Sequence, residues 1–234
     1  MRIQRSITFA VCLFMLPLYS QAELSITAGI FSDYVANGVT QTEGDPALQL
    51  SLDWANSDNL YVGAWASNVD FGEGDDNSTE VDIYAGMVLS VSAQVSVDLG
   101  TVYYQYFGDK ESDELAFNEI YALTSYESKA GVSEVNIWYS WNYSGTDAAH
   151  NIVQLAHAFA LAENHLLRVS VDRLASMDTN EYDWEGHPSY LNYQAAYITQ
   201  YKNFDVEIAA TKTTLDIKQG DTRLVAGISR TFSF

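Results

Sequence analysis

Charged side chains recur at every second position within otherwise apolar segments of this sequence. Such spacing places neighbouring charges on one face of an extended strand. A face dominated by carboxylates attracts cations and repels anions. The set holds eight acidic and two basic residues, which are Asp53, Glu80, Asp82, Asp98, Glu134, Asp172, Asp205, Glu207, Arg168 and Arg223. Glu119 is a further candidate, although the segment around it alternates poorly.

A hydrolytic site is the main alternative chemistry, because His187-Pro188-Ser189 superficially resembles the His-x-Ser pair of some lipid hydrolases. A nucleophilic serine needs a histidine that a third polar group holds in place. The proline between the two residues, their place in a predicted loop and the lack of an obvious orienting group argue against catalysis. The sequence therefore predicts that the protein is not an enzyme, and an activity abolished by Ser189→Ala would contradict this prediction.

Metal and cofactor binding are not predicted either. Carboxylates cluster at 70–80, 109–114 and 178–185, and oxygen-rich loops can bind calcium or magnesium. Their spacing does not match the calcium-binding loop motif, so a solvated acidic surface is the simpler interpretation. The one cysteine is Cys12 and the 4 histidines are scattered, which disfavours both a zinc site and a disulfide.

The elements that must position these charges are short β-strands. Apolar and polar residues alternate with a period of two, for example over 134–143, and clusters of Gly, Asn, Asp and Ser separate the runs. About twelve such segments are predicted, each near the ~9–11 residues that a tilted membrane strand needs. They centre on Ile26, Leu50, Ala64, Ile83, Leu99, Ile120, Ile137, Leu155, Val169, Ala195, Ile208 and Val225.

The links between these segments alternate between short and long. The short links are predicted at 56–59, 91–92, 127–131, 162–164 and 201–203, and the longer ones at 36–45, 70–78, 108–113, 144–149, 175–187 and 213–220. Tight periplasmic turns and longer external loops are typical of outer-membrane barrels, whose even strand number returns both termini to one side. No linker, low-complexity block or internal repeat divides the chain, so one domain over 23–234 is predicted.

The first 22 residues have the features of a cleaved export signal. Arg2 and Arg5 precede an apolar run over 7–18, and Ser20-Gln21-Ala22 offers small residues for cleavage. The run is shorter than the ~20 apolar residues of a membrane-spanning helix. Cleavage would remove two of the 11 basic residues and none of the 31 acidic ones. The mature chain would then be strongly acidic, which excludes nucleic acid as a partner.

Aromatic residues near the ends of the predicted strands, and the alternating segment that ends the chain, are typical of a membrane barrel. Amphipathic aromatic rings form girdles at membrane surfaces. Candidates near strand ends are Trp54, Tyr61, Tyr103, Tyr104, Tyr106, Phe107, Tyr126, Trp141, Tyr143 and Tyr190. Apolar and aromatic residues alternate up to Phe232 and Phe234, as in the terminal strand that the barrel-assembly machinery recognises. Ser229 stands where the consensus of that strand has glycine.

Two stretches resemble the TorF-like porin family, whose porin label is itself largely inferred from architecture. One runs from Ser32-Asp33-Tyr34 through Gly38-Val39-Thr40-Gln41-Thr42 to Gly44-Asp45-Pro46-Ala47-Leu48-Gln49, and the other is 61–71, with Gly63-Ala64-Trp65-Ala66-Ser67-Asn68-Val69-Asp70-Phe71. A frequent arginine of the first motif is Asn37 here. The resemblance implies an outer-membrane barrel and carries no catalytic residues.

These patterns together predict an all-β, closed, antiparallel up-and-down transmembrane barrel of about twelve strands in the bacterial outer membrane. Placing a charge on the lipid face costs roughly 2–4 kcal/mol for a base at the midplane and less for an acid, so the ten charges should line the interior. The predicted function is passive diffusion of small solutes, with cations preferred. A non-conducting surface barrel with partner-binding or cation-binding acidic loops is the alternative. The expected partners are outer-membrane lipid, the assembly machinery and small solutes.

Overall fold

The computed structural model describes residues 23–234, and the predicted export signal at 1–22 lies outside the described residues. Strands account for most of the described chain, and three short 3-10 helices lie in its loops. These are η1 (Ser112–Leu115), η2 (Tyr143–Gly145) and η3 (Lys218–Gly220). Within residues 23–234, no helix is both long enough and apolar enough to cross a membrane.

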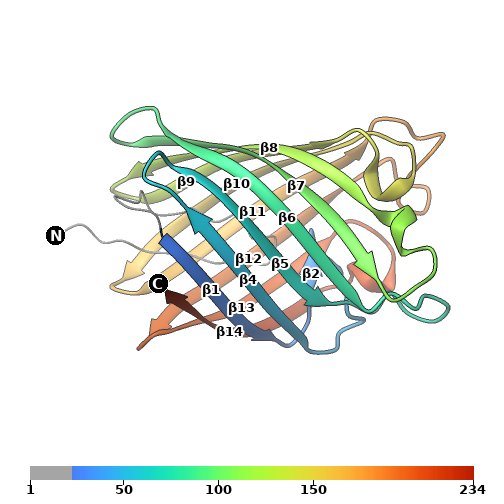
Figure 1. Ribbon diagram of the computed structural model, residues 1–234, viewed down its shortest axis with the longest axis horizontal. Helices are drawn as coiled ribbons and strands as arrows, with labels where there is room; N and C mark the ends of the chain where they lie inside the picture. The colour runs from blue at the N-terminus through green and yellow to red at the C-terminus, as the bar shows by residue number, and fades with distance from the viewer. Residues whose placement is uncertain (1–22) are drawn as a thin grey trace.

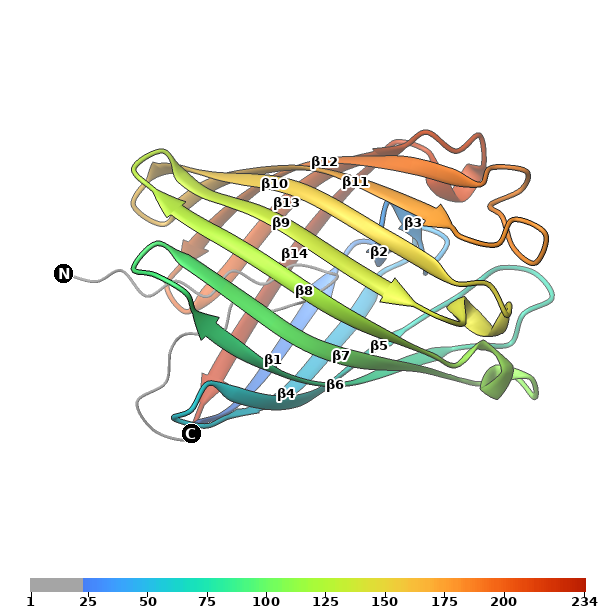
Figure 2. The ribbon, with the colours of Figure 1, turned by 90° about the horizontal axis from the view of Figure 1, so that it is seen from above.

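Twelve antiparallel strands close into one barrel, with β1 paired to β14 on one side and to β4 on the other. The barrel strands are β1 (Glu23–Phe31), β4 (Ala47–Ala55), β5 (Leu60–Asn68), β6 (Thr79–Ser90), β7 (Val95–Phe107), β8 (Phe117–Ser128), β9 (Gly131–Ser140), β10 (His150–Ala162), β11 (His165–Ser176), β12 (Ser189–Tyr201), β13 (Phe204–Thr213) and β14 (Arg223–Ser233). The strands tilt relative to the barrel axis (Figures 1 and 2). The predicted fold class is therefore confirmed, and each predicted segment centre lies in its own barrel strand.

Exposure alternates along the strands in the sense opposite to that of a soluble protein. On β4, Leu48, Leu50 and Leu52 are exposed on the outside, whereas Gln49 and Ser51 are buried inside. Closure pairs the edges of the sheet and satisfies its backbone hydrogen bonds, which is what a hydrocarbon environment requires. The outer face is therefore suited to lipid, and polar groups collect in the interior.

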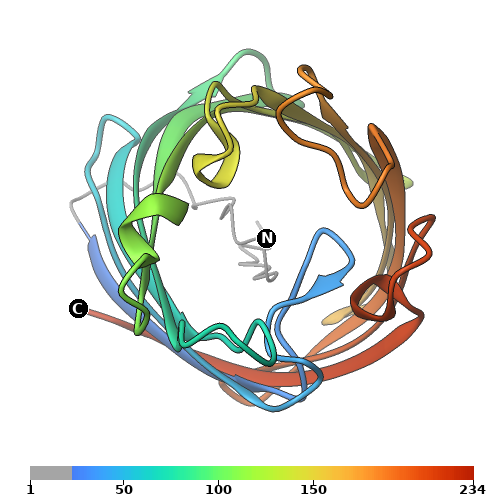
Figure 3. The ribbon, with the colours of Figure 1, turned by 90° about the vertical axis from the view of Figure 1, so that its right-hand side faces the viewer.

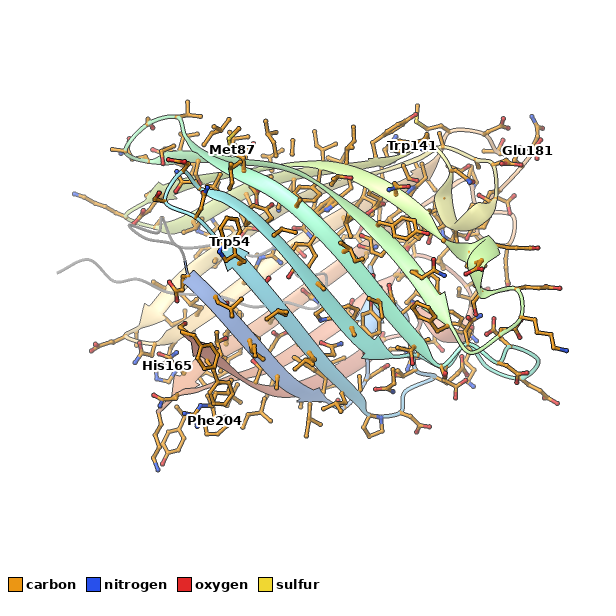
Figure 4. All side chains as sticks on the ribbon, in the orientation of Figure 1. Trp54, Met87, Trp141, His165, Glu181 and Phe204 are labelled. Carbon is orange, nitrogen blue, oxygen red and sulfur yellow. The ribbon has the colours of Figure 1, made fainter. Side chains whose placement is uncertain are left out.

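The aromatic residues near strand ends divide between the two faces. Trp54 and Phe204 point outward near one end of the barrel, and Trp141 points outward near the other (Figure 4). These positions match girdles at the two membrane surfaces. The sequence-based assignment is wrong for five other residues, whose rings are buried or half-buried inside the barrel or its mouth: Tyr61, Tyr104, Tyr106, Tyr143 and Tyr190. Tyr143 lies in η2, and the other four occupy the inward side of the strand pleat.

Short turns gather at one end of the barrel and long loops at the other, here called the short-turn end and the long-loop end (Figure 1). The start of β1 and the end of β14 both lie at the short-turn end. The link over 32–46 differs from the predicted loop because it contains a hairpin of β2 (Val35–Ala36) and β3 (Val39–Thr40). This hairpin projects inside the ring of strands (Figure 3).

Candidate functional site

The interior of the barrel is the candidate site, and one part of its wall is built from tyrosines that lie over glycines. The rings of Tyr61 and Tyr121 cover Gly86 and Gly100, where an added Cβ would lie 2.3 Å from each ring hydroxyl. Tyr61 Oη donates a hydrogen bond of 2.6 Å to Asp98 and contacts Tyr121 Oη at 2.6 Å. Glycine at these positions thus creates the space in which the tyrosines pack flat against β6 and β7.

The same arrangement recurs one strand earlier. The ring of Tyr84, on β6, covers Gly63, on β5. Its hydroxyl donates to Asp53, which also accepts a hydrogen bond of 2.8 Å from Ser51. Two of the predicted interior acids, Asp53 and Asp98, are therefore held by tyrosine hydroxyls. We call the surface formed by Tyr61, Tyr84, Tyr121 and these glycines the tyrosine–glycine wall.

The opposite part of the interior is polar and contains the interior base Arg168. Its guanidinium donates to Glu134 at 2.7 Å and to Gln154 at 2.8 Å. Asn192 donates to Asp172 at 2.8 Å and accepts from a threonine of β13 at 2.7 Å. Strands β9 to β13 therefore carry a connected network in which at least one carboxylate has an opposing cation.

Asp33 anchors the base of the inserted hairpin. Its carboxylate accepts hydrogen bonds from Thr40 at 2.5 Å, from Thr42 at 3.0 Å and from Arg223 at 3.1 Å. The exposed fractions of the Asp33 and Arg223 side chains are 7% and 17%, so this ion pair is largely shielded from solvent. Arg223, predicted to line the interior, thus fixes the hairpin to β14.

The tip of the hairpin rests on the far wall. Asn37 and Gly38 form its turn with φ of 49° and 84°, and two positive values are what a type I′ turn requires. The carbonyl of Asn37 accepts a hydrogen bond of 3.2 Å from Tyr190, and Gly38 lies directly against the Asn192 side chain. The Asn-Gly pair is the sequence signal that would have revealed this hairpin.

The two stretches that carry the family resemblance meet in space. Tyr34 of the hairpin packs edge to face on Trp65 of β5, with ring centroids 5.3 Å apart. The side chain of Asn68 accepts from the Leu48 amide at 2.7 Å and donates to the Pro46 carbonyl at 3.2 Å. The first stretch is therefore the hairpin and its exit, and the second is the strand that supports it.

A cavity of about 560 Å³ lies at the long-loop end, bordered by the hairpin, by strands from β5 to β12 and by the loop over 177–188. Twelve of its lining residues are aromatic and six are acidic, and its lining contains neither lysine nor arginine. The acidic members are Glu43, Glu80, Asp82, Glu119, Asp183 and Glu185, and the aromatic ones are Tyr34, Trp65, Phe71, Tyr84, Tyr104, Tyr106, Phe117, Trp138, Tyr143, Tyr182, Trp184 and Tyr190.

Several polar atoms of this cavity are buried without a hydrogen-bond partner. Tyr106 donates to one oxygen of Glu80 at 3.2 Å, but the other oxygen has no partner. The Oδ1 of Asp82 and the indole nitrogen of Trp138 are also unpartnered. His150 lies 3.5 Å from a Glu119 oxygen, and neither of its ring nitrogens makes a hydrogen bond. Buried polar atoms without partners are costly, and the side chains that carry them all border the cavity.

Above the cavity, two loop carboxylates are stabilised in their charged form. Hydrogen bonds from Gln219 and Lys218 lower the pKa of Glu43 and tie the loop of the hairpin to η3. Backbone hydrogen bonds from Glu111 and Asp76 lower the pKa of Asp109. The pKa of Tyr182, in the loop over 177–188, is raised to about 12 by burial. The mouth of the barrel therefore stays acidic at neutral pH.

The ten sequence-predicted charges all lie on inward-facing positions of the strands, and Glu119 joins them. Of the ten, Glu80 and Asp82 border the cavity, Arg223 lies at the base of the hairpin, and the others occupy inward positions elsewhere on the strands. Sequence reasoning did not identify His150 as part of the interior, although it occupies an inward position on β10, nor the aromatic lining.

The residues of the alternative hydrolytic site are not part of the cavity lining. His187 belongs to the loop over 177–188, where its backbone pairs with Trp184, and Ser189 begins β12. Neither residue borders the cavity. In the part of the chain that the structure describes, no cluster of three or more His, Cys, Asp or Glu side chains has the geometry to hold a metal ion.

The fold is that of the outer-membrane porins. The structure is similar to the NanC porin, with a TM-score of 0.59 at 8% identity over 89% of this chain and 98% of that one. An outer-membrane channel from Pseudomonas putida F1 gives 0.58 at 8% identity, over 93% and 97%. The KdgM porin in complex with oligogalacturonate gives 0.56 at 6% identity, over 90% and 99%.

Sequence comparison identifies the family. Residues 18–232 match the model of a family described as "Bacterial protein of unknown function (Gcw_chp)", and the chain belongs to this family. No curated protein matches the chain. The finer resemblance to the TorF-like porins stays a prediction.

Proposed function

We propose that this protein is an outer-membrane channel through which small solutes diffuse passively, and that it prefers cations. The observation that carries the proposal is the excess of inward-facing carboxylates inside a closed barrel. Nine acidic positions, the eight predicted ones and Glu119, face inward on the strands against two arginines, and both arginines are paired with acids.

Both arginines of the interior have an acidic partner of their own. Arg168 faces Glu134, and Arg223 faces Asp33, so both interior bases are largely neutralised by their own partners. Of the acids that border the cavity, Glu43 is paired with Lys218, whereas Glu80, Asp82 and Glu119 form no ion pair with a lysine or arginine in the described residues. Negative charge in a region shielded from water raises the local concentration of cations and excludes anions. We propose that the ten predicted charges line the route of the solute.

The hairpin supplies the size limit of the proposed channel. It projects into the ring of strands, and its residues Tyr34, Asn37 and Thr40 border the cavity (Figure 3). Twelve-stranded barrels lie between the eight-stranded ones, which side chains fill, and the large porins, which hold a wide aqueous lumen. A hairpin held against the wall thus narrows an interior that would otherwise be wider.

The proposed location rests on the outer surface and on the end of the chain. Leu48, Leu50 and Leu52 are each about half exposed on the outer face, as lipid contact requires. Arg230, close to the end of β14, lies over the rings of Phe204 and Phe232 at 5.5 and 4.6 Å. We propose that the assembly machinery reads this strand up to Phe234, and that long loops face outside the cell.

Planar-bilayer recording with a potassium chloride gradient tests the proposal. The folded barrel should give stepwise conductance and a reversal potential of the sign that marks cation selectivity. Substituting Glu80→Gln together with Asp82→Asn should lower that selectivity, whereas Asp58→Asn, in a short turn, should not. Anion selectivity, or the absence of conductance from folded protein, would overturn the proposal.

A non-conducting barrel is the second candidate, and the tyrosine–glycine wall is the observation that favours it. Tyr61 and Tyr121 contact one another through their hydroxyls and occupy interior volume on one side. If the remaining interior is filled in the same way, the protein would act through its acidic loops instead. Conductance recordings separate the two candidates, because a filled barrel passes no current even when every strand is formed.

A further inference from the structure

The cavity at the long-loop end combines a group of three carboxylates with an aromatic lining, and a general preference for cations does not explain this combination. Three carboxylates border the cavity together: Glu80 and Asp82 come from β6 and Glu119 comes from β8, the two strands on either side of β7. Tyr104 lies between them, since it pairs in register with Asp82 and its hydroxyl donates to Glu119 at 2.8 Å. One oxygen of Glu80 and one of Asp82 remain buried and unpartnered, and the exposed fraction of Glu80 is only 2%.

Aromatic rings border the same cavity as these carboxylates. Tyr143 of η2 packs edge to face on Phe117 with centroids 5.2 Å apart, and on Tyr182 at 5.4 Å. Trp184 continues this cluster, with centroids 5.2 Å from Tyr182 and 5.1 Å from Tyr190. The loop over 177–188 therefore brings its own rings to the mouth of the barrel, where a hydrated ion alone would need no apolar surface.

We propose that this cavity binds a small organic cation, an alkylammonium or quaternary ammonium compound. The positive charge faces Glu80, Asp82 and Glu119, and the alkyl groups contact the rings of Tyr143 and Trp184. Aromatic rings attract cations through their electron-rich faces, and this attraction is strongest where water is excluded. The cavity volume of about 560 Å³ lies within the ~300–1,000 Å³ of small-molecule sites. The inference rests on the proposed channel function, because the cation reaches the site from the solute path.

A neutral sugar is the competing ligand, because it also stacks on rings and donates hydrogen bonds to carboxylates. It would bring no positive charge to the three neighbouring carboxyl groups, and no lysine or arginine borders the cavity to supply one. A monovalent metal ion would compensate charge but would make no use of the aromatic lining. The organic cation is the class that satisfies both features.

Calorimetric titration of the folded full chain tests the site independently of conductance. The protein is kept in a nonionic polyoxyethylene detergent, which has neither a quaternary ammonium group nor a sugar headgroup. Tetramethylammonium and choline chloride should bind saturably at constant ionic strength, whereas potassium chloride should bind more weakly and glucose should give no saturable heat. Saturable glucose binding, or choline heats equal to those of potassium, would overturn the proposal.

Three variants locate the binding. Asp82→Asn combined with Glu119→Gln should weaken choline binding roughly tenfold or more, because a shielded charge pair is lost. Trp184→Leu should weaken tetramethylammonium binding roughly threefold or more while leaving potassium binding unchanged. Asp58→Asn makes the same type of charge change in a short turn and should bind choline like the wild type. Equal effects of Asp58→Asn and the cavity variants would contradict the site.

Bilayer recording then separates failure of the site from failure of the channel. Choline binding in calorimetry without any conductance would overturn the channel and leave the site in place. Conductance of potassium with no saturable choline binding and no block by choline would overturn the site and leave the channel in place. Folding of each variant is checked by its heat-dependent mobility in gels, so that loss of binding is scored only on folded barrels.

Discussion

Gly38 at the tip of the inserted hairpin offers the sharpest test of how the interior is organised. Its φ is 84°, a region that other residues enter at a cost of roughly 1–2 kcal/mol. A Cβ at this position would lie 2.4 Å from the Asn192 side-chain oxygen and 2.5 Å from a Thr213 methyl group. Gly38→Ala therefore carries a backbone penalty and a contact that moves the tip away from the wall.

The backbone term alone converts into a shift of roughly 5–30-fold in the equilibrium between docked and released hairpin. The matched control is Gly74→Ala, since Gly74 has φ of 98° but nothing within 4 Å of an added Cβ. Gly74 lies in the loop over 69–78, away from the hairpin tip. Comparing the two variants isolates the contact with the wall from the cost of the backbone conformation.

Hydrogen exchange followed by mass spectrometry measures the docking. Two amides of the hairpin report on it, because Tyr34 donates to Thr42 at 3.1 Å and Gln41 donates to the Tyr34 carbonyl at 2.7 Å. Gly38→Ala should accelerate exchange over 32–46, and Gly74→Ala should not. Equal exchange of this segment in the wild type and both variants would refute the reasoning that the tip is held by close packing.

Three further predictions concern stability and pH. Gly86→Ala should displace the ring of Tyr61 and cost about 1–3 kcal/mol in the free energy of unfolding by urea; a loss below about 0.5 kcal/mol would contradict the packing. Asp33→Ala should cost about 3 kcal/mol because it leaves Arg223 without its partner, and a double-mutant cycle that shows no coupling between the two would contradict this. The pKa of Glu43 is lower in the folded state than its unfolded value of 4.5. Its contribution to stability is therefore present above pH 4.5 and is lost as the pH falls through the lower folded value. An NMR titration should show an apparent pKa below 4.5 for Glu43, and a value at or above 4.5 would exclude the effect.

The orientation of strand residues was predictable because it depends on local geometry. Successive side chains of a strand point to opposite faces, so the alternation of Leu48, Gln49 and Leu50 determines which side faces lipid. The same rule placed Asp53 and Asp172 inside. The same alternation also places Tyr104 and Tyr106 in the interior, because both occupy even-numbered, inward-facing positions of β7. Their position near a strand end had suggested a girdle instead.

The sequence by itself determined the twelve strands, the alternation of turns and loops and the inward placement of charge, because each depends on residues close in the chain. Tertiary structure alone decided that the link over 32–46 folds into the barrel. That choice depends on the Asp33–Arg223 pair, whose members are 190 positions apart, and on Gly38 fitting against Asn192. Closure of the barrel likewise brings the loop over 177–188 beside η2, and this contact turns separate acidic and aromatic residues into one cavity.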